Sequence, residues 1–397
     1  MNFETDVADK EFRKKTRAFL RNKLQELFGP NWPERGFELD DQRTWTRALN
    51  AGGYLVPHWP KEWGGSDWPV TWPRIMEQEL SLAQPPNVDL IGLGFVGPML
   101  CKYGSPQQKR RYLQRIRNAD DIWCQGFSEP GAGSDTMSLT TTAVRQRDGF
   151  KVTGRKLWIT GAHYANMMFT LVRVQLPDGR REAGLTFLLI NMRDPGLKVR
   201  PVIMIDGAHR LNEVTLENVH VPLDDMVGEQ GKGWVYARSL LADERAIVAG
   251  LGQVRALLSS LQKILASESC NGLPLIEDPK YYLPFTKMLA ELNALEFMEL
   301  RRLHDKSTNS SHASFTPILK LRGCELRQRA TELAVQALGE VALEAPQLAG
   351  VGQGVLAPPR RISAMTRRFL FERSATLAGG TSEIQRNIIA AVELGLS

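Results

Sequence analysis

One glutamate of this sequence is surrounded by aliphatic neighbours and is well placed for acid–base chemistry. Glu244 lies in a segment with helical periodicity. The residues three and four positions away are Leu240, Leu241, Ile247 and Val248. A carboxylate on such a face is costly unless it is paired or used, and desolvation would raise its pKa toward that of a general base. Arg245 follows directly, so a structural Glu–Arg pair explains the pattern equally well.

A glycine-rich loop at Cys124–Asp135 is suited to a flat polar ligand or a phosphate. Its sequence is Cys-Gln-Gly-Phe-Ser-Glu-Pro-Gly-Ala-Gly-Ser-Asp. The glycines leave backbone N–H groups accessible, and Ser128 and Ser134 add hydroxyls. A tight turn followed by a Ser-Asp helix cap accounts for the same residues equally well.

Two further segments combine polar and ring-binding residues. Gly154–Gly161 forms an expected strand in which Trp158 and Thr160 offer a stacking face and a hydroxyl, although core packing is the commoner role of a strand tryptophan. Gly379–Arg386 opens the last expected helix. There Ser382 and Gln385 fit a capping box, and a glycine-led helix start also binds anions.

A Gly-x-Gly-x-x-Gly pattern at Gly92–Gly97 suggests a dinucleotide fingerprint, but its context is wrong. Only a short apolar run after Pro85-Pro86 precedes it, Gly104 would interrupt the following helix, and no alternation of strands and helices follows. The pattern therefore indicates glycines at close helix contacts.

Composition bounds the class of protein. The chain has 397 residues, 43% of them hydrophobic and 24% charged, as in a globular protein of two or three domains. The formal net charge of +6 is mild, and we expect the basic run Lys109–Arg117 to be a solvated helix face. No metal-ligand spacing, N-terminal targeting signal or apolar span is visible. We expect a cytoplasmic protein with four reduced, buried cysteines, namely Cys101, Cys124, Cys270 and Cys324.

The periodicity of the apolar residues changes twice along the chain, which predicts helices, then a β domain, then helices. The expected divisions are 1–121, 122–230 and 231–397. The expected helices are Arg43–Ala51, Ile75–Leu82, Trp234–Ser267, Pro284–Lys306, Pro317–Glu344 and Ser382–Leu394, with a polar connection at Ser307–Ser314. The expected strands are Gly149–Gly154, Ala183–Met192 and Asn212–Val221.

Together these segments resemble the acyl-CoA dehydrogenase family over essentially the whole chain. Ser-Glu-Pro-Gly-Ala-Gly-Ser-Asp, Lys-x-Trp-Ile-Thr and Gly-Gly-Thr-Ser-Glu-Ile-Gln-Arg occur in the family's order and spacing. The resemblance implies an α+β fold with a helical N-terminal domain, a middle β-barrel and a C-terminal four-helix bundle. It also implies FAD as cofactor. No metal site is expected, because the histidines and cysteines form no ligand cluster.

The resemblance also assigns site residues by position. Those expected to bind FAD are Gln125, Phe127, Ser128, Trp158, Ile159, Thr160, Gln336, Thr381, Ser382 and Glu383. Those expected to bind the acyl-CoA substrate are Ser134, Arg245 and Gly380.

The resemblance also bears on the base. Many members have it directly before the Gly-Thr of the last motif, which is Gly379 here and cannot accept a proton. A subgroup similar to isovaleryl-CoA and long-chain dehydrogenases places it on a bundle helix before an arginine, as in Glu244-Arg245. The implied reaction removes an α proton through Glu244 and a β hydride to flavin, giving a trans-2-enoyl-CoA. An electron-transfer flavoprotein is the expected electron acceptor.

Departures from the family pattern concern the contacts between subunits. The usual Arg-x-x-Phe-Gly is replaced by Glu268-Ser-Cys-Asn-Gly, and the usual Gln-x-x-Gly-Gly becomes Gln336-Ala-Leu-Gly-Glu. The chain looks most like the large subunit of pimeloyl-CoA-type bacterial dehydrogenases, so a homo- or hetero-oligomer with a smaller related subunit is expected. A flavin oxidase or monooxygenase of the same fold, or a non-catalytic subunit, are the alternatives. His209, Asp206 and the Trp59–Trp63 loop either shape the acyl pocket or only pack, and packing is favoured.

Overall fold

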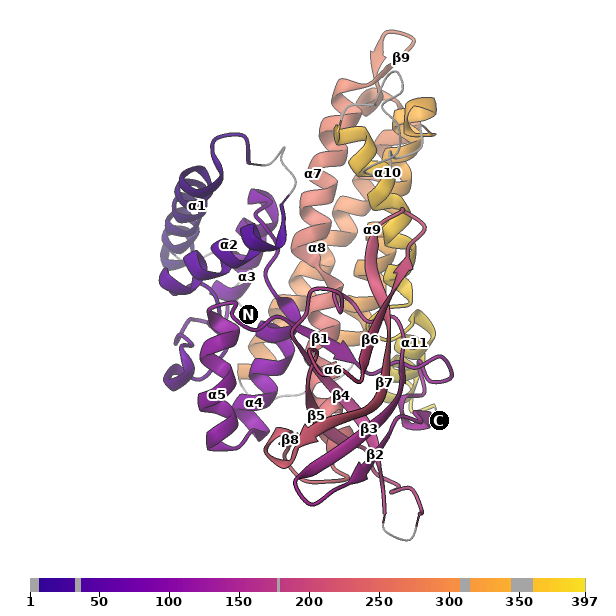
Figure 1. The fold of residues 1–397 in the computed structure, drawn as a ribbon. Coiled ribbons are helices and arrows are strands. Elements are labelled where there is room, and N and C mark those ends of the chain that lie inside the picture. Colours follow the sequence, from indigo (N-terminus) through magenta and orange to yellow (C-terminus); the bar gives the residue numbers. More distant parts are fainter. Residues whose placement is uncertain (1–6, 33–36, 177–178, 308–314, 344–359, 397) are drawn as a thin grey trace, which may run out of the picture.

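The chain folds into an N-terminal helical part, a β-sheet and a C-terminal helical bundle, and the two helical parts also contact each other directly (Figure 1). The computed structural model describes residues 7–32, 37–176, 179–307, 315–343 and 360–396, and for 240–247, 305–307, 343 and 360–363 it describes the backbone alone. The polar connection expected at Ser307–Ser314 lies almost wholly outside these ranges. None of the described helices is long and apolar enough to cross a bilayer.

The N-terminal part is built from short helices separated by proline and glycine loops. They are α1 (Val7–Phe28), α2 (Leu39–Ala51), α3 (Trp72–Ala83), α4 (Gly97–Tyr103) and α5 (Pro106–Arg117). The glycine pattern at Gly92–Val96 forms one π-helical turn that runs into α4. A Cβ on Gly97 would lie 1.9 Å from the Trp59 ring, whose Nε1 donates to the Leu93 carbonyl. The expectations of a close helix contact there, and of a packing role for Trp59, are confirmed.

The basic run forms most of α5, and Arg111, Arg115 and Arg117 of this run contact neighbouring groups. Arg115 pairs with Asp121 at 2.7 Å and Arg111 with Asp225 at 3.2 Å. Arg117 donates to the Trp63 carbonyl. These contacts tie the helix to its surroundings and give no indication of a polyanion site.

The middle part is one twisted sheet. Its strands are β1 (Trp123–Gly126), β2 (Thr142–Arg145), β3 (Gly149–Lys156), β4 (Met167–Gln175), β5 (Thr186–Asn191), β6 (Leu197–Ile203), β7 (His209–Pro222) and β8 (Met226–Val227). The order is β6-β7-β3-β2-β4-β5-β8, with β1 beside β4. Among the described residues the edge strands β6 and β8 do not pair, so the sheet of the expected barrel domain is not closed. Closure depends on strand tilt and stagger, which alternation in the sequence does not specify.

The C-terminal part is a bundle of long helices with a small hairpin at its far end (Figure 1). The helices are α6 (Gly233–Ala249), α7 (Leu251–Ser267), α8 (Pro279–Ser307), α9 (Phe315–Leu338), α10 (Arg360–Glu372) and α11 (Ser382–Glu393), and the hairpin is β9 (Ser269–Cys270) with β10 (Leu273–Pro274). The expected single helix Trp234–Ser267 is two helices, because Gly250 has φ +58° and ends α6. The expected helix Pro317–Glu344 ends at Leu338, because Gly339 has φ +59°.

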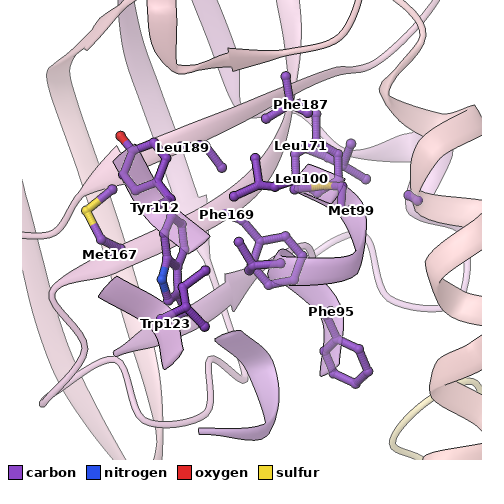
Figure 2. Packing of buried hydrophobic residues seen from close by; sticks show 14 of the residues in the cluster. Phe95, Met99, Leu100, Tyr112, Trp123, Met167, Phe169, Leu171, Phe187 and Leu189 are labelled. Carbon is purple, nitrogen blue, oxygen red and sulfur yellow. The ribbon is translucent and has the colours of Figure 1, made fainter. Parts of the chain in front are cut away.

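One apolar core joins the N-terminal helices to the sheet. Figure 2 shows Phe169 of β4 among side chains that come from α4, from β1 and from the neighbouring strand β5. Trp123 at the start of β1 meets Tyr112 of α5 edge-on at 5.6 Å. This packing fixes β1, and therefore the glycine-rich loop that follows it, to the N-terminal helices.

A carboxylate at the junction of the N-terminal part and the bundle gives a pH-dependent prediction. Glu77 of α3 accepts the N–H of Gly252 in the first turn of α7 at 3.4 Å. Burial, with help from Glu299, raises the pKa of Glu77 to about 7. An acid with a raised pKa in the folded state loses stability as pH rises through that pKa. Glu77→Gln should therefore increase the free energy of unfolding at pH 8 by roughly 1–3 kcal/mol and change it little at pH 5. Thermal unfolding at both pH values measures this, and equal shifts at both would contradict it.

Candidate active site

Strand β1 delivers the glycine-rich loop to the edge of the sheet. Gln125 is half-buried in β1, which runs parallel to β4. Phe127 is buried and its ring meets Phe169 and Phe187 edge-on at 5.3 and 5.8 Å. The Phe127 ring is therefore part of the core, whereas the next residue, Ser128, is half-buried.

A buried ion pair holds this loop to strand β3. Lys156 has no exposed surface, and its Nζ donates to Glu129 Oε1 and to the Leu171 carbonyl, each at 2.9 Å. Glu129 also accepts from the N–H and hydroxyl groups of Thr140 and Thr141. Burial alone would raise the pKa of Glu129, but Lys156 and these donors lower it to about 2. The carboxylate therefore stays ionised across the physiological range and keeps the loop attached.

The Trp158–Thr160 segment is a turn, and the expectation of a strand there is wrong. Strand β3 ends at Lys156, and Trp158 has φ +65° with 56% of its surface exposed. A tryptophan rarely adopts a positive φ, so the surroundings must impose it. The N–H of Leu157 donates to Ser128, and that of Ile159 to Asn212. The result is an open indole face beside an exposed Thr160, next to the glycine-rich loop.

Sequence reasoning did not identify Asn212, which fixes this turn. Asn212 is fully buried in β7, and its Nδ2 donates to the Ile159 carbonyl at 3.0 Å and contacts His163 Nδ1 at 3.1 Å. Its Oδ1 lies 2.8 Å from His209 Nε2. The two imidazoles stack with centroids 3.9 Å apart, and burial followed by the neighbouring His209 lowers the pKa of His163. A polar side chain at the start of the expected strand Asn212–Val221 was the signal that could have found it.

The Asn212 contacts predict a loss of stability and cofactor on mutation. Asn212→Leu would leave the Ile159 carbonyl without its side-chain donor, at a cost of about 1–3 kcal/mol. It should also release the Trp158 turn and lower the flavin content. Urea unfolding and flavin absorbance per chain measure both effects. Glu217→Gln on the same strand breaks only an exposed pair with Lys198 and should cost less than about 1 kcal/mol.

The Gly379–Thr381 turn leads into α11 and contains two consecutive glycines in the left-handed region, with φ +64° and +83°. Thr381 is the N-cap, and its hydroxyl accepts the N–H of Ile384 at 3.2 Å. The expected capping box of Ser382 with Gln385 is therefore wrong, because the N-cap is Thr381, one residue before Ser382. The Gln385 Nε2 donates instead to the Gly380 carbonyl at 3.0 Å. Glu383 is exposed.

This turn touches the helix that contains Glu244. A Cβ on Gly379 would lie 3.0 Å from Val248 Cγ2, and Val248 is one helical turn beyond Glu244 on α6. The Arg327 guanidinium donates to the Val248 carbonyl at 3.0 Å and pairs with the buried Glu372 at 3.1 Å. The end of α6 is therefore held beside the turn. The side chains of Glu244 and Arg245 lie outside the described residues, so their roles stay predictions.

The remaining predicted residues are scattered. Ser134 is exposed on the glycine-rich loop, where added Cβ atoms on Gly131 and Gly133 would meet nothing within 4 Å. Gln336 is exposed near the end of α9. Lys320 of α9 contacts the Gly379–Thr381 turn through the Gly380 carbonyl. Gln336 is 16 residues further along the same helix, a distance of about 24 Å from Lys320 along the helix axis. Gln336 is therefore remote from the turn of its own chain.

The expectations for Asp206 and for the cysteines had different outcomes. Asp206 is buried and pairs with Arg210 at 3.0 Å, which agrees with a packing role. All four cysteines are free, but Cys270 is exposed in the β9–β10 hairpin and Cys101 is only half-buried. No cluster of metal-binding side chains occurs in the part of the chain that the structure describes.

The residues of these three segments fit FAD. Ser382 Oγ and Gln385 Oε1 are buried beside the glycine turn and have no hydrogen-bond partner among the described residues. Such atoms are rare unless a ligand or water satisfies them. The exposed indole of Trp158 and the N–H groups of a glycine-led helix start complement a flat ring and a phosphate.

Comparison with known proteins agrees with this geometry. Three family models match in succession: the acyl-CoA dehydrogenase N-terminal domain at residues 7–120, the middle domain at 124–219 and the C-terminal domain at 231–394. The chain is 32% identical to the acyl-CoA dehydrogenase IpdE1 of Mycobacterium tuberculosis over 97% of both proteins. The chain belongs to the acyl-CoA dehydrogenase family. It is an oxidoreductase that dehydrogenates acyl-CoA, and FAD is its cofactor.

Solved structures show the same fold. The chain is similar to the ChsE4-ChsE5 complex from Mycobacterium tuberculosis, with a TM-score of 0.83 and 27% identity over 100% of this chain and 99% of that one. It is equally similar to the Tcur3481-Tcur3483 steroid ACAD, with a TM-score of 0.83 and 25% identity over all of both chains.

Proposed function

We propose that this chain oxidises the Cα–Cβ bond of an acyl-CoA thioester to a trans-2-enoyl-CoA, with Glu244 as the base. The contact between Gly379 and Val248 carries this proposal. The resemblance implies that many family members have a carboxylate at the position of Gly379. Here this glycine lies against Val248, which is one helical turn beyond Glu244 on α6. A carboxylate on α6 can therefore replace one on the turn without moving the reaction site.

Different residues of the chain bind the cofactor, polarise the substrate and accept the proton. FAD, when bound, supplies a two-electron acceptor. Ser128, Trp158 and Thr160 hold and orient its ring, and Thr381 to Glu383 hold its polar portion. The N–H groups of the Gly379–Thr381 turn donate to no described residue and are suited to polarise the thioester carbonyl, which acidifies the α C–H. Glu244 accepts that proton, and the packed bundle keeps water away.

We infer that a smaller related subunit completes the enzyme. Gln336 is remote from its own chain's turn, and an exposed hairpin replaces the Arg-x-x-Phe-Gly segment. The two similar structures named above are described as two-component assemblies. Native mass spectrometry of the chain, expressed alone and together with its neighbouring genes' products, tests this proposal. An oligomer of this chain alone that is active and has FAD bound at every site would contradict it.

We propose a ring-bearing acyl group as substrate, on the strength of the likeness to a steroid ACAD. The enzyme would then act in acyl-CoA degradation in the cytoplasm and pass electrons to an electron-transfer flavoprotein. The test is anaerobic flavin bleaching by straight-chain, branched, dicarboxyl and ring-bearing CoA esters, with mass analysis of the products. The ring-bearing ester should bleach the flavin fastest and lose two hydrogens. Rapid reoxidation in air would instead favour an oxidase, and no bleaching by any ester would favour a non-catalytic subunit.

A further inference from the structure

The last turn of α6 has a carbonyl group that the helix itself does not satisfy. Gly250 has φ +58° and ends the helix. The N–H that would meet the Val248 carbonyl in a longer helix is that of Gly252, and it donates to Glu77 instead. Arg327 of α9 supplies the missing donor, because its Nη1 donates to the Val248 carbonyl at 3.0 Å.

Two positions on α9, one helical turn apart, allow a close approach of this helix end. A Cβ on Gly323 would lie 2.5 Å from the Ala249 carbonyl oxygen. A Cβ on Gly250 would lie 2.7 Å from Arg327 Nη1. A side chain at either glycine would therefore push the two helices apart, and the end of α6 lies on α9 through its backbone.

Arg327 is buried, so its charge needs a partner as well as an acceptor. Its Nε pairs with Oε2 of the buried Glu372 at 3.1 Å, and its Nη2 lies 3.4 Å from Cys324 Sγ. The other oxygen of Glu372 accepts from Arg368 Nε, one turn earlier on α10. A guanidinium holds its donors in a rigid, planar fork, so this one side chain joins α9 to both α6 and α10. Replacing a buried ion pair by apolar side chains is often neutral for stability, so stability alone does not explain the pair.

Val248 connects this anchor to the candidate active site. Arg327 holds its carbonyl, and its side chain lies beside Gly379, where a Cβ would be 3.0 Å from Val248 Cγ2. Glu244 is one helical turn before Val248. A displacement of the end of α6 would therefore change the distance between Glu244 and the Gly379–Thr381 turn. A misplacement of about 1 Å can slow a reaction about a hundredfold.

We propose that Arg327, paired with Glu372, is a positioning residue that fixes the end of α6 on α9 and so sets the distance from Glu244 to the Gly379–Thr381 turn. The role of Glu244 rests on the proposed function, whereas the fixing of α6 does not. Arg327 acts through the Val248 carbonyl, and in this proposal it contacts neither substrate nor flavin.

Hydrogen exchange on the full-length chain without FAD tests whether α6 is fixed in this way. The amides of residues 246–249 lie inside α6 and donate to the preceding turn. Arg327→Met combined with Glu372→Gln removes both charges of the pair, so neither is left buried without the other. This double variant should speed exchange of these amides about tenfold or more, the effect of losing one hydrogen bond to a charged group. The amides of residues 257–265 in the middle of α7 should be unchanged.

Two single variants complete the exchange experiment. Arg327→Lys keeps a charged donor without the planar fork and should restore part of the protection. Arg322→Met removes an exposed charge from the same helix and should change neither region. Wild-type exchange at residues 246–249 in the double variant, or an equal acceleration in α7, would overturn the proposal.

Flavin reduction by saturating acyl-CoA tests the consequence, in the FAD-loaded enzyme with its companion subunit if needed. The double variant should bind FAD and acyl-CoA with wild-type dissociation constants and reduce the flavin about ten- to a hundredfold more slowly. A role in folding alone would instead lower the flavin content and leave the rate per bound flavin unchanged. That result would contradict the positioning role.

A mutant cycle with Glu244→Gln separates this proposal from the proposed function. If Arg327 acts through Glu244, the double variant should cause little further loss once residue 244 is glutamine. A further loss as large as in the wild-type background would show that Arg327 does not act through the base. If Glu244→Gln alone reduces flavin at the wild-type rate, the base is wrongly assigned, and the exchange measurement still decides whether Arg327 fixes α6.

Discussion

Glu244→Gln should bind FAD and acyl-CoA normally and reduce the flavin between a hundred and ten thousand times more slowly than the wild type, the usual range for loss of a general base (roughly 10²–10⁴). Glutamine keeps the size and hydrogen-bonding capacity of glutamate but cannot accept the α proton. The loss should appear in the rate of flavin reduction at saturating substrate and leave the dissociation constant little changed.

The neighbouring positions supply the controls for this variant. Glu244→Asp keeps a carboxylate on a shorter stem and should fall between the wild type and Glu244→Gln. Arg245→Lys keeps the charge and tests the alternative that the pair is only structural. If Glu244→Gln loses folding stability together with activity, while a charge-conserving change at 245 does the same, the structural interpretation of the pair is correct.

Lys156→Met should destabilise the protein by about 3–5 kcal/mol, because it leaves the buried Glu129 carboxylate without its cation. Flavin should be lost at the same time, since the ion pair joins the glycine-rich loop to the strand that precedes Trp158. Urea unfolding and the flavin-to-protein ratio measure the two effects.

A double variant separates the ion pair from the volume of its side chains. Glu129→Gln combined with Lys156→Met removes both charges and should recover much of the stability, because the penalty comes from an unpaired buried charge. Lys198→Met breaks an exposed pair with Glu217 and should cost less than about 1 kcal/mol. A double variant as unstable as Lys156→Met alone would contradict this explanation.

The sequence predicted the order of helical and β segments because periodicity follows burial directly. It did not predict positive φ angles, and these account for several errors. Gly250 interrupts an otherwise continuous helical pattern, and Trp158 leaves the strand on which its neighbours alternate. Both depend on contacts with distant parts of the chain: the Arg327 guanidinium would lie 2.7 Å from a Cβ on Gly250, and Asn212 holds the residue after Trp158.

The buried charges were recognised unevenly. Glu244 was selected because its neighbours three and four positions away are aliphatic. The same rule does not select the buried Lys320, whose neighbours at those positions are Thr316, Pro317, Gly323 and Cys324. Lys156 gave no such signal, since it alternates within a strand and its partner Glu129 lies 27 residues earlier. The division at 121/122 and 230/231 and the individual FAD contacts stay predictions.

Anaerobic mixing of the FAD-loaded protein, with its companion subunit if needed, and a saturating acyl-CoA tests the central claim most directly. The visible flavin absorbance should bleach in the wild type, with one equivalent of enoyl-CoA formed per flavin, and should persist in Glu244→Gln that has bound the same amount of FAD. A wild-type protein that binds no FAD, or a Glu244→Gln variant that bleaches at the wild-type rate, would contradict the account.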